Sequence, residues 1–431
     1  MTAASSAEDN VLVIGAGMAG IEASLTLAEA GAKVYLVERE PLFGGKTIKY
    51  EEVFANMECS TCMAAPKQQE VLQNDRIELM TLSEVREVKG EAGDFTVGVH
   101  RKARYVDAEA CIGCNACFDP CPVSLPNEFE ENLGERKAIY LPCPGALPNV
   151  PSIDTERCVR FTENKECTLC QEACMFEAID FNQKDEDVEL KVSGIIVATG
   201  SDLIDSSQLK ELGYSGEGNV YTALELERLY ASNGPTEGTI QLRDGRTPSS
   251  AAIVHCAGRK DTGYCSAVCC MYSLKFVHYL KDKLPDITVH EFYTDMCIPG
   301  KKYQEFHDRM KDKVNLVRYD ELSVSPNGGS VGISYKSGAG TNEKLDVDML
   351  ILAPAMVPSR GAEELAGMLG IEQGGRGFFG SSTGSPAESG KGGIYVAGCA
   401  QGPKDIGQSV AQAGAAVGRF LSAASRGFSG E

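Results

Sequence analysis

The chain carries seventeen cysteines, and the densest run of them is Cys111-Ile-Gly-Cys114-Asn-Ala-Cys117-Phe-Asp-Pro-Cys121-Pro122. This run has the spacing C-x2-C-x2-C-x3-C-P, in which three closely spaced thiolates wrap one [4Fe-4S] cluster and the fourth reaches another. Iron–sulfur chemistry is therefore the first function that the sequence suggests. The run also requires a second set of thiols elsewhere in the chain.

That second set consists of Cys158 and the stretch Cys167-Thr-Leu-Cys170-Gln-Glu-Ala-Cys174. In two-cluster ferredoxins the fourth cysteine of each run binds the cluster of the other run. This rule assigns two ligand sets. Cluster one takes Cys111, Cys114, Cys117 and Cys174, and cluster two takes Cys121, Cys158, Cys167 and Cys170. The second set departs from the common pattern, because eight residues separate Cys158 from Cys167 and Met175 stands where a Pro is usual. Structural zinc also uses C-x2-C pairs, but it takes four ligands rather than eight.

Four further cysteines follow a strand-like stretch, Ala251-Ala-Ile-Val-His-Cys256-Ala-Gly. This stretch reads as the first strand of a doubly wound domain, yet the Gly-x-Gly-x-x-Gly that would bind the phosphates of NAD(P)H is missing. In its place stand Cys256, Cys265, Cys269 and Cys270. The pattern disfavours a nicotinamide site and suggests a third cluster, with buried thiols in a packed helix as the alternative.

The N-terminal part has the pattern of a dinucleotide-binding βαβ unit. Val11-Leu-Val-Ile-Gly-Ala-Gly-Met-Ala-Gly20 predicts a buried strand and a tight turn, followed by a helix through Ala30 and a second strand over residues 33–38. Gly15, Gly17 and Gly20 would give the turn, the approach to a pyrophosphate and the helix packing, and Glu38 would meet a ribose hydroxyl. Paired Gly44 and Gly45 would let the backbone approach the cofactor again.

Two apolar strands far along the chain complete this set, Gly194-Ile-Ile-Val-Ala-Thr-Gly200 and Gly393-Ile-Tyr-Val-Ala-Gly398. Together the motifs resemble the thioredoxin reductase and glutathione reductase group, an α/β class with two dinucleotide domains. The resemblance implies that the glycine motif and both late strands hold FAD. In that group the last strand ends in Gly-Asp, whereas here Cys399 follows Gly398, so we expect that contact to differ.

We expect five segments along the chain. These are the first part of the FAD-binding domain (1–104), an inserted bacterial ferredoxin-like domain with two [4Fe-4S] clusters (105–185), the return strand of the FAD domain with a polar connector (186–245), a second Rossmann-like domain that carries a cluster in place of NAD(P)H (246–345), and the C-terminal part of the FAD-binding domain (346–431).

The composition is that of a globular protein, with 431 residues, 43% hydrophobic and 24% charged. A net charge of -20 argues against nucleic acid as a partner, because phosphate contacts need clustered Lys and Arg. We find no apolar run long enough for a membrane span and no signal peptide, so we expect a cytoplasmic protein, with any membrane association made through partner subunits. In that compartment the cysteines are not expected to form disulfides.

Several long sequence motifs resemble those of one family, the A subunits of heterodisulfide reductase and their relatives. They include Met57-Glu-Cys59-Ser-Thr-Cys62, Arg104-Tyr-Val-Asp-Ala-Glu-Ala-Cys111, Arg136-Lys-Ala-Ile-Tyr-Leu-Pro142, Tyr264-Cys-Ser-Ala-Val-Cys-Cys-Met-Tyr272 and Ala397-Gly-Cys-Ala-Gln-Gly-Pro-Lys-Asp-Ile406. The resemblance implies a [4Fe-4S] cluster on Cys256, Cys265, Cys269 and Cys270 near FAD. It also places residues 401–406 along the flavin, where Lys404 would favour an anionic reduced form.

With the glycine motifs, the resemblance gives an expected FAD-binding set: Gly15, Gly17, Gly20, Glu38, Arg39, Gly44, Gly45, Lys46, Val85, Ala198, Thr199, Gly200, Gly398, Cys399, Gln401, Gly402, Lys404, Asp405 and Ile406. No catalytic acid or base is expected. Five cysteines remain. Cys59 and Cys62 could be a redox dithiol, cluster ligands or a packed pair, and Cys143, Cys297 and Cys399 are interpreted as structural.

The sequence thus predicts an FAD and iron–sulfur electron-transfer subunit, an oxidoreductase with three clusters. The resemblance implies redox partner subunits of the heterodisulfide reductase B/C or quinone-interacting type, with a homodimer inside a larger complex. One alternative is a self-contained NAD(P)H-dependent iron–sulfur flavoprotein, which would need the missing second glycine motif. Another is a scaffold that binds clusters only for stability.

Overall fold

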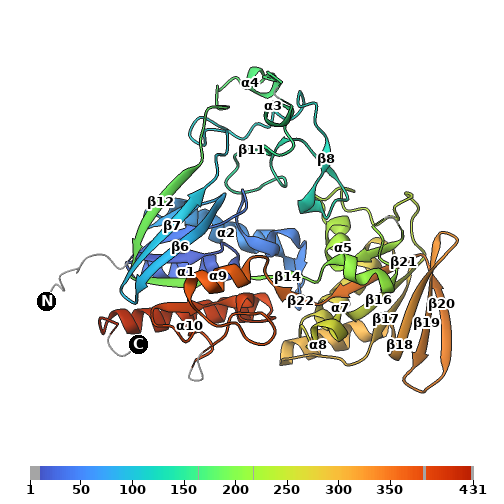
Figure 1. Ribbon diagram of the computed structural model, residues 1–431. Helices are drawn as coiled ribbons and strands as arrows, with labels where there is room; N and C mark the ends of the chain where they lie inside the picture. The colour runs from blue at the N-terminus through green and yellow to red at the C-terminus, as the bar shows by residue number, and fades with distance from the viewer. Residues whose placement is uncertain (1–9, 164, 217, 382–384, 429–431) are drawn as a thin grey trace.

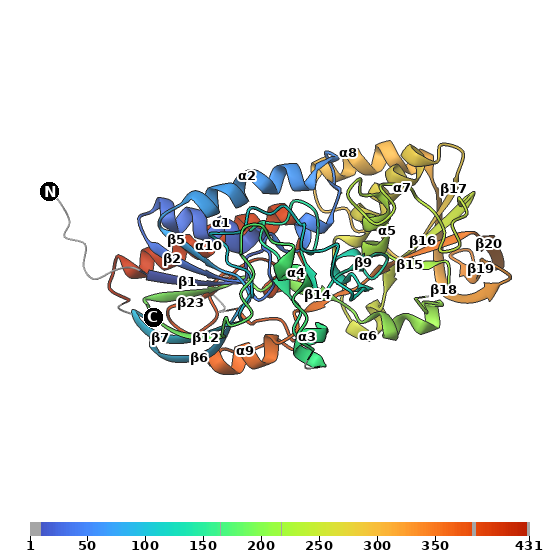
Figure 2. The ribbon, with the colours of Figure 1, turned by 90° about the horizontal axis from the view of Figure 1, so that it is seen from above.

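The computed structural model describes residues 10–163, 165–216, 218–381 and 385–428. Two α/β halves lie side by side, and a third lobe of short elements rises above them (Figure 1). Viewed from above, the first sheet and the second sheet occupy opposite ends of an elongated body (Figure 2). Among the described residues, no helix combines the length and apolarity needed to cross a membrane.

The first half is built on a parallel five-stranded sheet. Its order is β23 (Ile394–Val396), β13 (Gly194–Val197), β1 (Asn10–Ile14), β2 (Lys33–Val37) and β5 (Ile77–Met80). Alternate residues of β1 enter two different cores: Val11 and Val13 face one, and Leu12 and Ile14 face the other. A strand buried on both faces needs such a continuous apolar run, which explains the sequence of β1.

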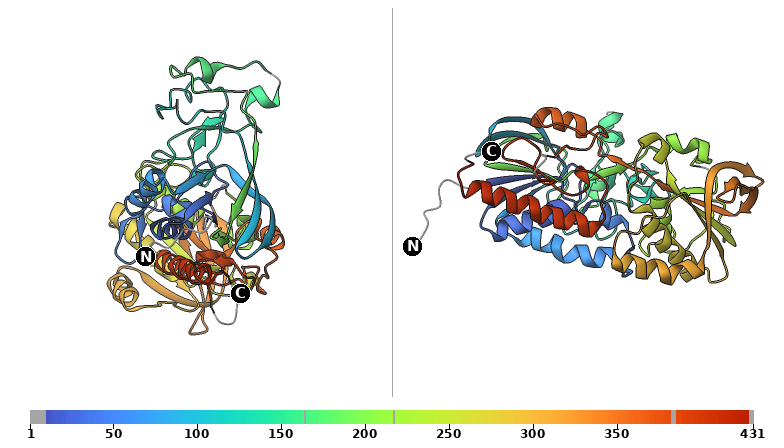
Figure 3. Two further views of the ribbon diagram at one scale, coloured as in Figure 1. Left: turned by 90° about the vertical axis from the view of Figure 1, so that its left-hand side faces the viewer. Right: turned by 90° about the horizontal axis from the view of Figure 1, so that it is seen from below.

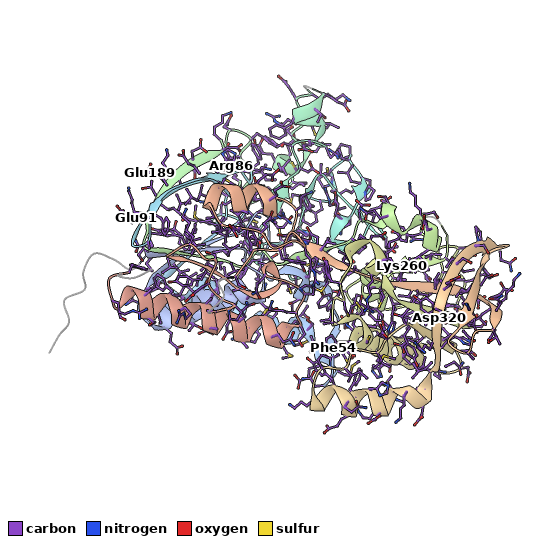
Figure 4. All side chains as sticks on the ribbon, turned by 60° about the horizontal axis from the view of Figure 1, so that its bottom comes forward. Phe54, Arg86, Glu91, Glu189, Lys260 and Asp320 are labelled. Carbon is purple, nitrogen blue, oxygen red and sulfur yellow. A yellow bond between two sulfur atoms is a disulfide. The ribbon has the colours of Figure 1, made fainter. Side chains whose placement is uncertain are left out.

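Helices and strands cover the two faces of this sheet. On one face α1 (Met18–Glu29) and α10 (Ile406–Ala424) pack against each other, with α2 (Ser60–Gln73) beside α1 (Figure 3). The other face is covered by α9 (Ala362–Leu369) and an antiparallel sheet of β12 (Glu186–Val192), β7 (Asp94–Arg101) and β6 (Ser83–Glu91). Arg86, Glu91 and Glu189 mark this outer sheet in Figure 4.

The second half is a seven-stranded sheet that is larger than expected. Its order is β15 (Val220–Thr222), β21 (Met349–Pro354), β16 (Ser250–Ala257), β17 (Thr288–Tyr293), β18 (Asn315–Asn327), β19 (Ser330–Ser337) and β20 (Asn342–Val347). Helices α5 (Ala223–Tyr230), α7 (Cys269–Lys283) and α8 (Lys301–Met310) pack on one face. The sheet therefore extends beyond 246–345 at both ends. The polar connector expected before residue 246 contains β15 and α5, because a capping box of Thr222 and Glu225 starts a helix there.

Two further strands and a charged network join the halves. Strands β14 (Ser201–Leu203) and β22 (Met356–Pro358) pair antiparallel, and Lys46 Nζ forms an ion pair with Asp202 at 2.8 Å beside them. In the network, the buried Lys275 of α7 pairs with the buried Glu227 of α5 and donates to the carbonyl of Glu52. Nearby, Phe54 packs its ring on Tyr303 of α8 (Figure 4).

The protruding lobe consists of short elements between residues 105 and 185. These are β8 (Leu125–Pro126), β9 (Glu135–Arg136), β10 (Ile139–Tyr140), β11 (Ser152–Ile153), α3 (Val159–Thr162) and α4 (Leu169–Glu172). A bridge between Val106 and Ile179 brings its two ends together, which suits an inserted segment. At its base, the buried Glu130 accepts hydrogen bonds from Arg228 of α5, at 2.7 and 3.2 Å.

Candidate cofactor sites

Glycines gather at the carboxyl end of the first sheet. Gly15 has a φ of +98°, and a Cβ there would lie 2.5 Å from the carbonyl oxygen of Ala198. A Cβ on Gly20 would lie 1.8 Å from the oxygen of Gly15, so only glycine lets α1 start this close to the turn. The strand β1, the turn and α1 thus leave a helix N-terminus open to an anionic group.

Glu38 lies against this turn. The amide of Ala16 donates to one of its carboxylate oxygens at 2.9 Å, and the amide of Glu40 donates to the other at 3.0 Å. Burial raises the pKa of Glu38, and these two backbone donors act in the opposite direction. The carboxylate is therefore fixed at the end of β2, the place where a dinucleotide-binding fold presents an acid to a ribose.

The paired glycines return to the first turn. The amide of Gly44 donates to the oxygen of Ala16 at 2.8 Å, and Gly44 forms a parallel bridge with Gly17. A Cβ on Gly45 would lie 2.9 Å from the Cα of Gly17. The two glycine segments, well separated in the sequence, thus form one backbone surface.

The C-terminal segment lies at the same edge. A Cβ on Gly398 would lie 2.8 Å from the Cβ of Ala19 in α1. The thiol of Cys399 donates to the carbonyl of Lys404 at 3.3 Å, so its sulfur points into the turn rather than replacing an outward-facing Asp. Asp405 caps α10 by accepting from the amide of Gln408, and its second oxygen accepts from Tyr303. Burial lowers the pKa of Lys404, whose Nζ donates to Gln401.

The other expected FAD residues fall into two places. Ala198, Thr199 and Gly200 follow β13, and the amide of Ala198 donates to Ile14 at 2.8 Å, so they share the edge with the glycines. Arg39 donates to the carbonyl of Arg360, and Lys46 is held by Asp202, so both side chains already serve the link between the halves. Val85 is buried in β6. Gly402 and Ile406 lie in the turn before α10 and at its first residue.

Four predicted thiols of the lobe surround one cavity. Cys121, Cys158, Cys167 and Cys170 line it together with apolar side chains: Pro122, Val123, Ile139, Ile153, Val159, Leu169 and Phe181. Burial, and then the nearby thiols of Cys158, Cys121 and Cys167, raise the pKa of Cys170 to about 11. A bound metal would instead lower the pKa of these thiols, because thiols ligate metal as thiolates.

A second group of thiols in the lobe lies around Cys117. Burial, and the charges of Cys170, Cys111 and Cys174, raise the pKa of Cys117 to about 12. Cys114 is exposed. Within the described chain, no three His, Cys, Asp or Glu side chains adopt the arrangement of a single-ion site. Ligands of one zinc ion lie about 2.3 Å from a common centre, whereas the ligands of a cube bind four separate irons.

The third group of thiols forms where β16 meets α7. Cys256 is the penultimate residue of β16 and lies at an irregularity in the pairing of β16 with β21. Its φ of +59° is unusual for a residue other than glycine. Cys269 and Cys270 begin α7, and both are buried. Burial, and then the surrounding thiols Cys256, Cys270 and Cys265, raise the pKa of Cys269 to about 12, so the four expected ligands share one location.

Two buried polar atoms beside this group have no hydrogen-bond partner among the described residues. One is Nδ1 of His255, a residue whose imidazole lies near Cys270, and the other is the hydroxyl of Tyr272, which lies near Cys269. Burial alone would lower the pKa of His255, but Glu291 and Cys270 outweigh it and raise the pKa to about 9. Buried polar atoms are rarely left unsatisfied, so these residues fit an electron-rich group bound by the cysteines.

Two findings change the interpretation of the remaining cysteines. Cys297 was expected to be structural only, but it lies beside Cys265 and Cys270, and its amide donates to the sulfur of Cys270 at 3.3 Å. Its distance in sequence from the other four hid this contact.

Cys59 and Cys62 form a disulfide at the N-terminus of α2. The expectation that the cysteines form no disulfides is therefore wrong for Cys59 and Cys62, because the first turn of a helix brings the two cysteines of a C-x-x-C motif close together. Cys143 is buried elsewhere.

Comparison with known proteins agrees with this fold. A family described as FAD dependent oxidoreductase matches residues 10–61. Among solved structures, thioredoxin reductase of T. acidophilum superposes with a TM-score of 0.54 at 13% identity, covering 97% of this chain and 99% of the other. The Lactococcus lactis enzyme gives 0.51 at 13% identity, covering 96% and 98%. The predicted fold class is confirmed, whereas the ferredoxin-like nature of the lobe stays a prediction.

Curated relatives are more similar in sequence. The A subunit of the H(2):CoB-CoM heterodisulfide,ferredoxin reductase of Methanothermobacter marburgensis is 40% identical over an alignment 425 positions long, which covers 96% of this chain and 64% of the relative. A protein of Archaeoglobus profundus, named as similar to the A subunit of heterodisulfide reductase, is 38% identical over an alignment 460 positions long, which covers 96% of this chain and 66% of the relative. The chain spans less than two thirds of these relatives. It belongs to the family of heterodisulfide reductase A subunits.

Proposed function

We propose that the chain is an FAD and iron–sulfur electron-transfer subunit of a heterodisulfide-reductase-like redox complex. The observation that supports this most directly is the grouping of the predicted ligands, all but the exposed Cys114, around three places on a flavoprotein fold. Those ligands are Cys111, Cys114, Cys117, Cys174, Cys121, Cys158, Cys167, Cys170, Cys256, Cys265, Cys269 and Cys270. Bound FAD would supply the conversion between electron pairs and single electrons.

The residues of the chain position and insulate these groups. The turn at Gly15 and Gly17 would hold the pyrophosphate of FAD through backbone amides, and Glu38 would orient a ribose. In the lobe, the apolar side chains around Cys121 and Cys170 would shield the sulfurs of a bound cluster from water. Exclusion of water and hydrogen bonds to sulfur are two of the factors that set the potential of such a cluster.

A nicotinamide-dependent reductase fits the second half less well. The turn after β16 keeps only Gly258 where a phosphate-binding loop would need three glycines, and α6 (Arg259–Thr262) that follows is a single turn. The thiols Cys256 and Cys269 occupy this carboxyl edge of the sheet instead. We therefore propose that electrons pass between flavin and clusters here, and onward to other subunits of the complex.

The test is the content of iron, acid-labile sulfide and FAD in full-length protein prepared without oxygen. Three clusters predict about twelve irons per FAD, and two predict about eight. Replacing Cys269 by Ser should remove about four irons, whereas the control Cys143→Ser, another buried thiol, should remove none. Protein that retains FAD but no iron would contradict the proposal, and about eight irons would remove its third site.

A further inference from the structure

A buried charged pair lies behind the third group of thiols. His255 of β16 and Glu291 of β17 are both fully buried, and Nε2 of the imidazole is 2.6 Å from a carboxylate oxygen. Ile253 and Val289 each lie two residues before one member of the pair, so they share its face of the sheet, and both belong to the core under α7. The imidazole therefore lies on the helix-covered face of the sheet, directly behind the first turn of α7.

Such a pair is expensive in an apolar core. Removing two charges from water costs several kcal/mol per ion, and well-packed apolar side chains often do as well or better. Moreover, Nδ1 of His255 and Oε2 of Glu291 have no hydrogen-bond partner among the described residues. The pair therefore contributes little to stability as it stands. The imidazole of His255 lies near the thiol of Cys270, and Nδ1 is its nitrogen that Glu291 does not bind.

The chemistry of an iron-bound thiolate supplies the missing partner. A ligating sulfur carries no proton and can only accept hydrogen bonds. Because Nε2 is occupied by Glu291, the nitrogen available to that sulfur is Nδ1, and it must carry a proton to donate. The sulfur of Cys270 would then accept two bonds, one from the imidazole and one from the amide of Cys297 at 3.3 Å. This arrangement matches metal sites in which a carboxylate orients an imidazole next to the metal ligands.

We propose that His255, held by Glu291, is a positioning residue of the third cluster that donates Nδ1–H to the sulfur of Cys270 and thereby raises the potential of that cluster. The inference rests on the proposed function, because it requires a cluster on these thiols. Donation to a ligating sulfur stabilises the reduced, more negative cluster. The third cluster would therefore accept electrons more readily than a cluster held by the same four cysteines without His255.

The experiment compares variants of the full chain in anaerobic redox titrations that follow the third cluster by electron paramagnetic resonance. His255→Leu/Glu291→Leu removes both members and leaves no unpaired buried charge. His255→Gln keeps an N–H donor at the same place. His290→Leu, on the adjacent residue of β17, is the matched control. Iron content is measured for each protein in parallel.

We expect the double Leu variant to keep about twelve irons. At a fixed potential its ratio of reduced to oxidised third cluster should fall at least tenfold, a shift of about 59 mV for one electron. The Gln variant should retain most of the wild-type ratio, and His290→Leu all of it. An unchanged ratio in the double variant with about twelve irons overturns the inference alone. About eight irons in the wild type overturns the third cluster and the inference with it.

A second measurement covers the case in which the double variant does not fold or loses the cluster. Wild-type protein labelled with ¹⁵N-histidine is examined in the reduced state by pulsed electron paramagnetic resonance. A ¹⁵N coupling that disappears in His255→Gln, but persists in His290→Leu, supports the hydrogen bond to sulfur. Absence of any histidine coupling in wild-type protein with about twelve irons overturns it.

Discussion

At the scale of single residues, Gly20 decides whether the first turn can receive a phosphate. Its Cβ would meet the oxygen of Gly15 at 1.8 Å, and this atom belongs to the backbone, so α1 would have to move. We expect Gly20→Ala to weaken FAD binding at least about tenfold, or ~1.4 kcal/mol, with an overpacking cost of roughly 1–3 kcal/mol in the unfolding free energy. Retained FAD and denaturant unfolding measure the two effects.

The control for this substitution is Gly418→Ala. Gly418 is exposed in α10 and a Cβ there meets nothing within 4 Å. In a helix interior, alanine is favoured over glycine by about 1 kcal/mol, so this variant should be slightly more stable with FAD retained. Equal FAD binding by Gly20→Ala and wild type would show that the turn does not carry the cofactor.

The residues around the cofactor differ in how far the sequence could predict them. The turn at Gly15 and the close packing at Gly20 were predictable because a strand, a turn and a helix are local and their spacing is fixed. The contact of these glycines with FAD stays a prediction. The pairing of His255 with Glu291 was not, because it depends on β16 and β17 being neighbours in the sheet. Cys297 was interpreted as structural for the same reason, since nothing local links it to Cys265.

At the scale of elements, the start of α2 holds a reactive pair. Cys59 is the N-cap, its sulfur accepts the amide of Cys62 at 3.2 Å, and Cys62 is exposed. A helix N-terminus stabilises a thiolate, and C-x-x-C pairs at this position exchange readily with other thiols. Because Cys59 and Cys62 form a disulfide, alkylation of the denatured, iron-free protein should label fifteen of the seventeen cysteines before reduction and all seventeen after it.

The variant Cys62→Ser tests the assignment of the pair. It leaves Cys59 without a partner, so all sixteen remaining cysteines should be labelled without reduction, as peptide mapping by mass spectrometry can show. If wild-type protein prepared without reductant already gives seventeen labelled cysteines, Cys59 and Cys62 are a dithiol rather than a disulfide.

The elements themselves were predictable to different degrees. The strands β1 and β13 follow from apolar runs that lead into glycine, β2 from an apolar run that ends at Glu38, and α1 from the apolar periodicity between them. All four lie where the sequence placed them. The strand β15 and the helix α5 have the local pattern of a connector, because Val220–Thr222 is only three residues long and Ala223–Tyr230 carries three charged residues. The strand β15 pairs with β21, and Arg228 of α5 contacts the buried Glu130, ninety-eight residues away. Neither long-range contact can be seen in a local pattern.

At the scale of the whole molecule, the two halves share one buried charge network. Glu227 of α5 pairs with Lys275 and accepts from the hydroxyl of Tyr279 at 3.1 Å, while Lys275 donates to the carbonyl of Glu52 at 2.9 Å. Glu52 lies in the segment that follows the second glycine loop, so the network ties the FAD half to α7. Because these groups are satisfied only when the halves are docked, the halves should unfold together.

Glu227→Gln should break this coupling. It leaves the ammonium of Lys275 buried without a counter-charge, which costs about 3–5 kcal/mol, and the transition should divide into two, with FAD released in one of them. The control is Glu227→Met/Lys275→Met, which removes both charges and should lose much less stability. Denaturant unfolding followed in parallel by circular dichroism and flavin fluorescence distinguishes the cases. Coincident transitions in Glu227→Gln would mean that contacts other than this network hold the halves together, with the pairing of β14 and β22 as the next candidate.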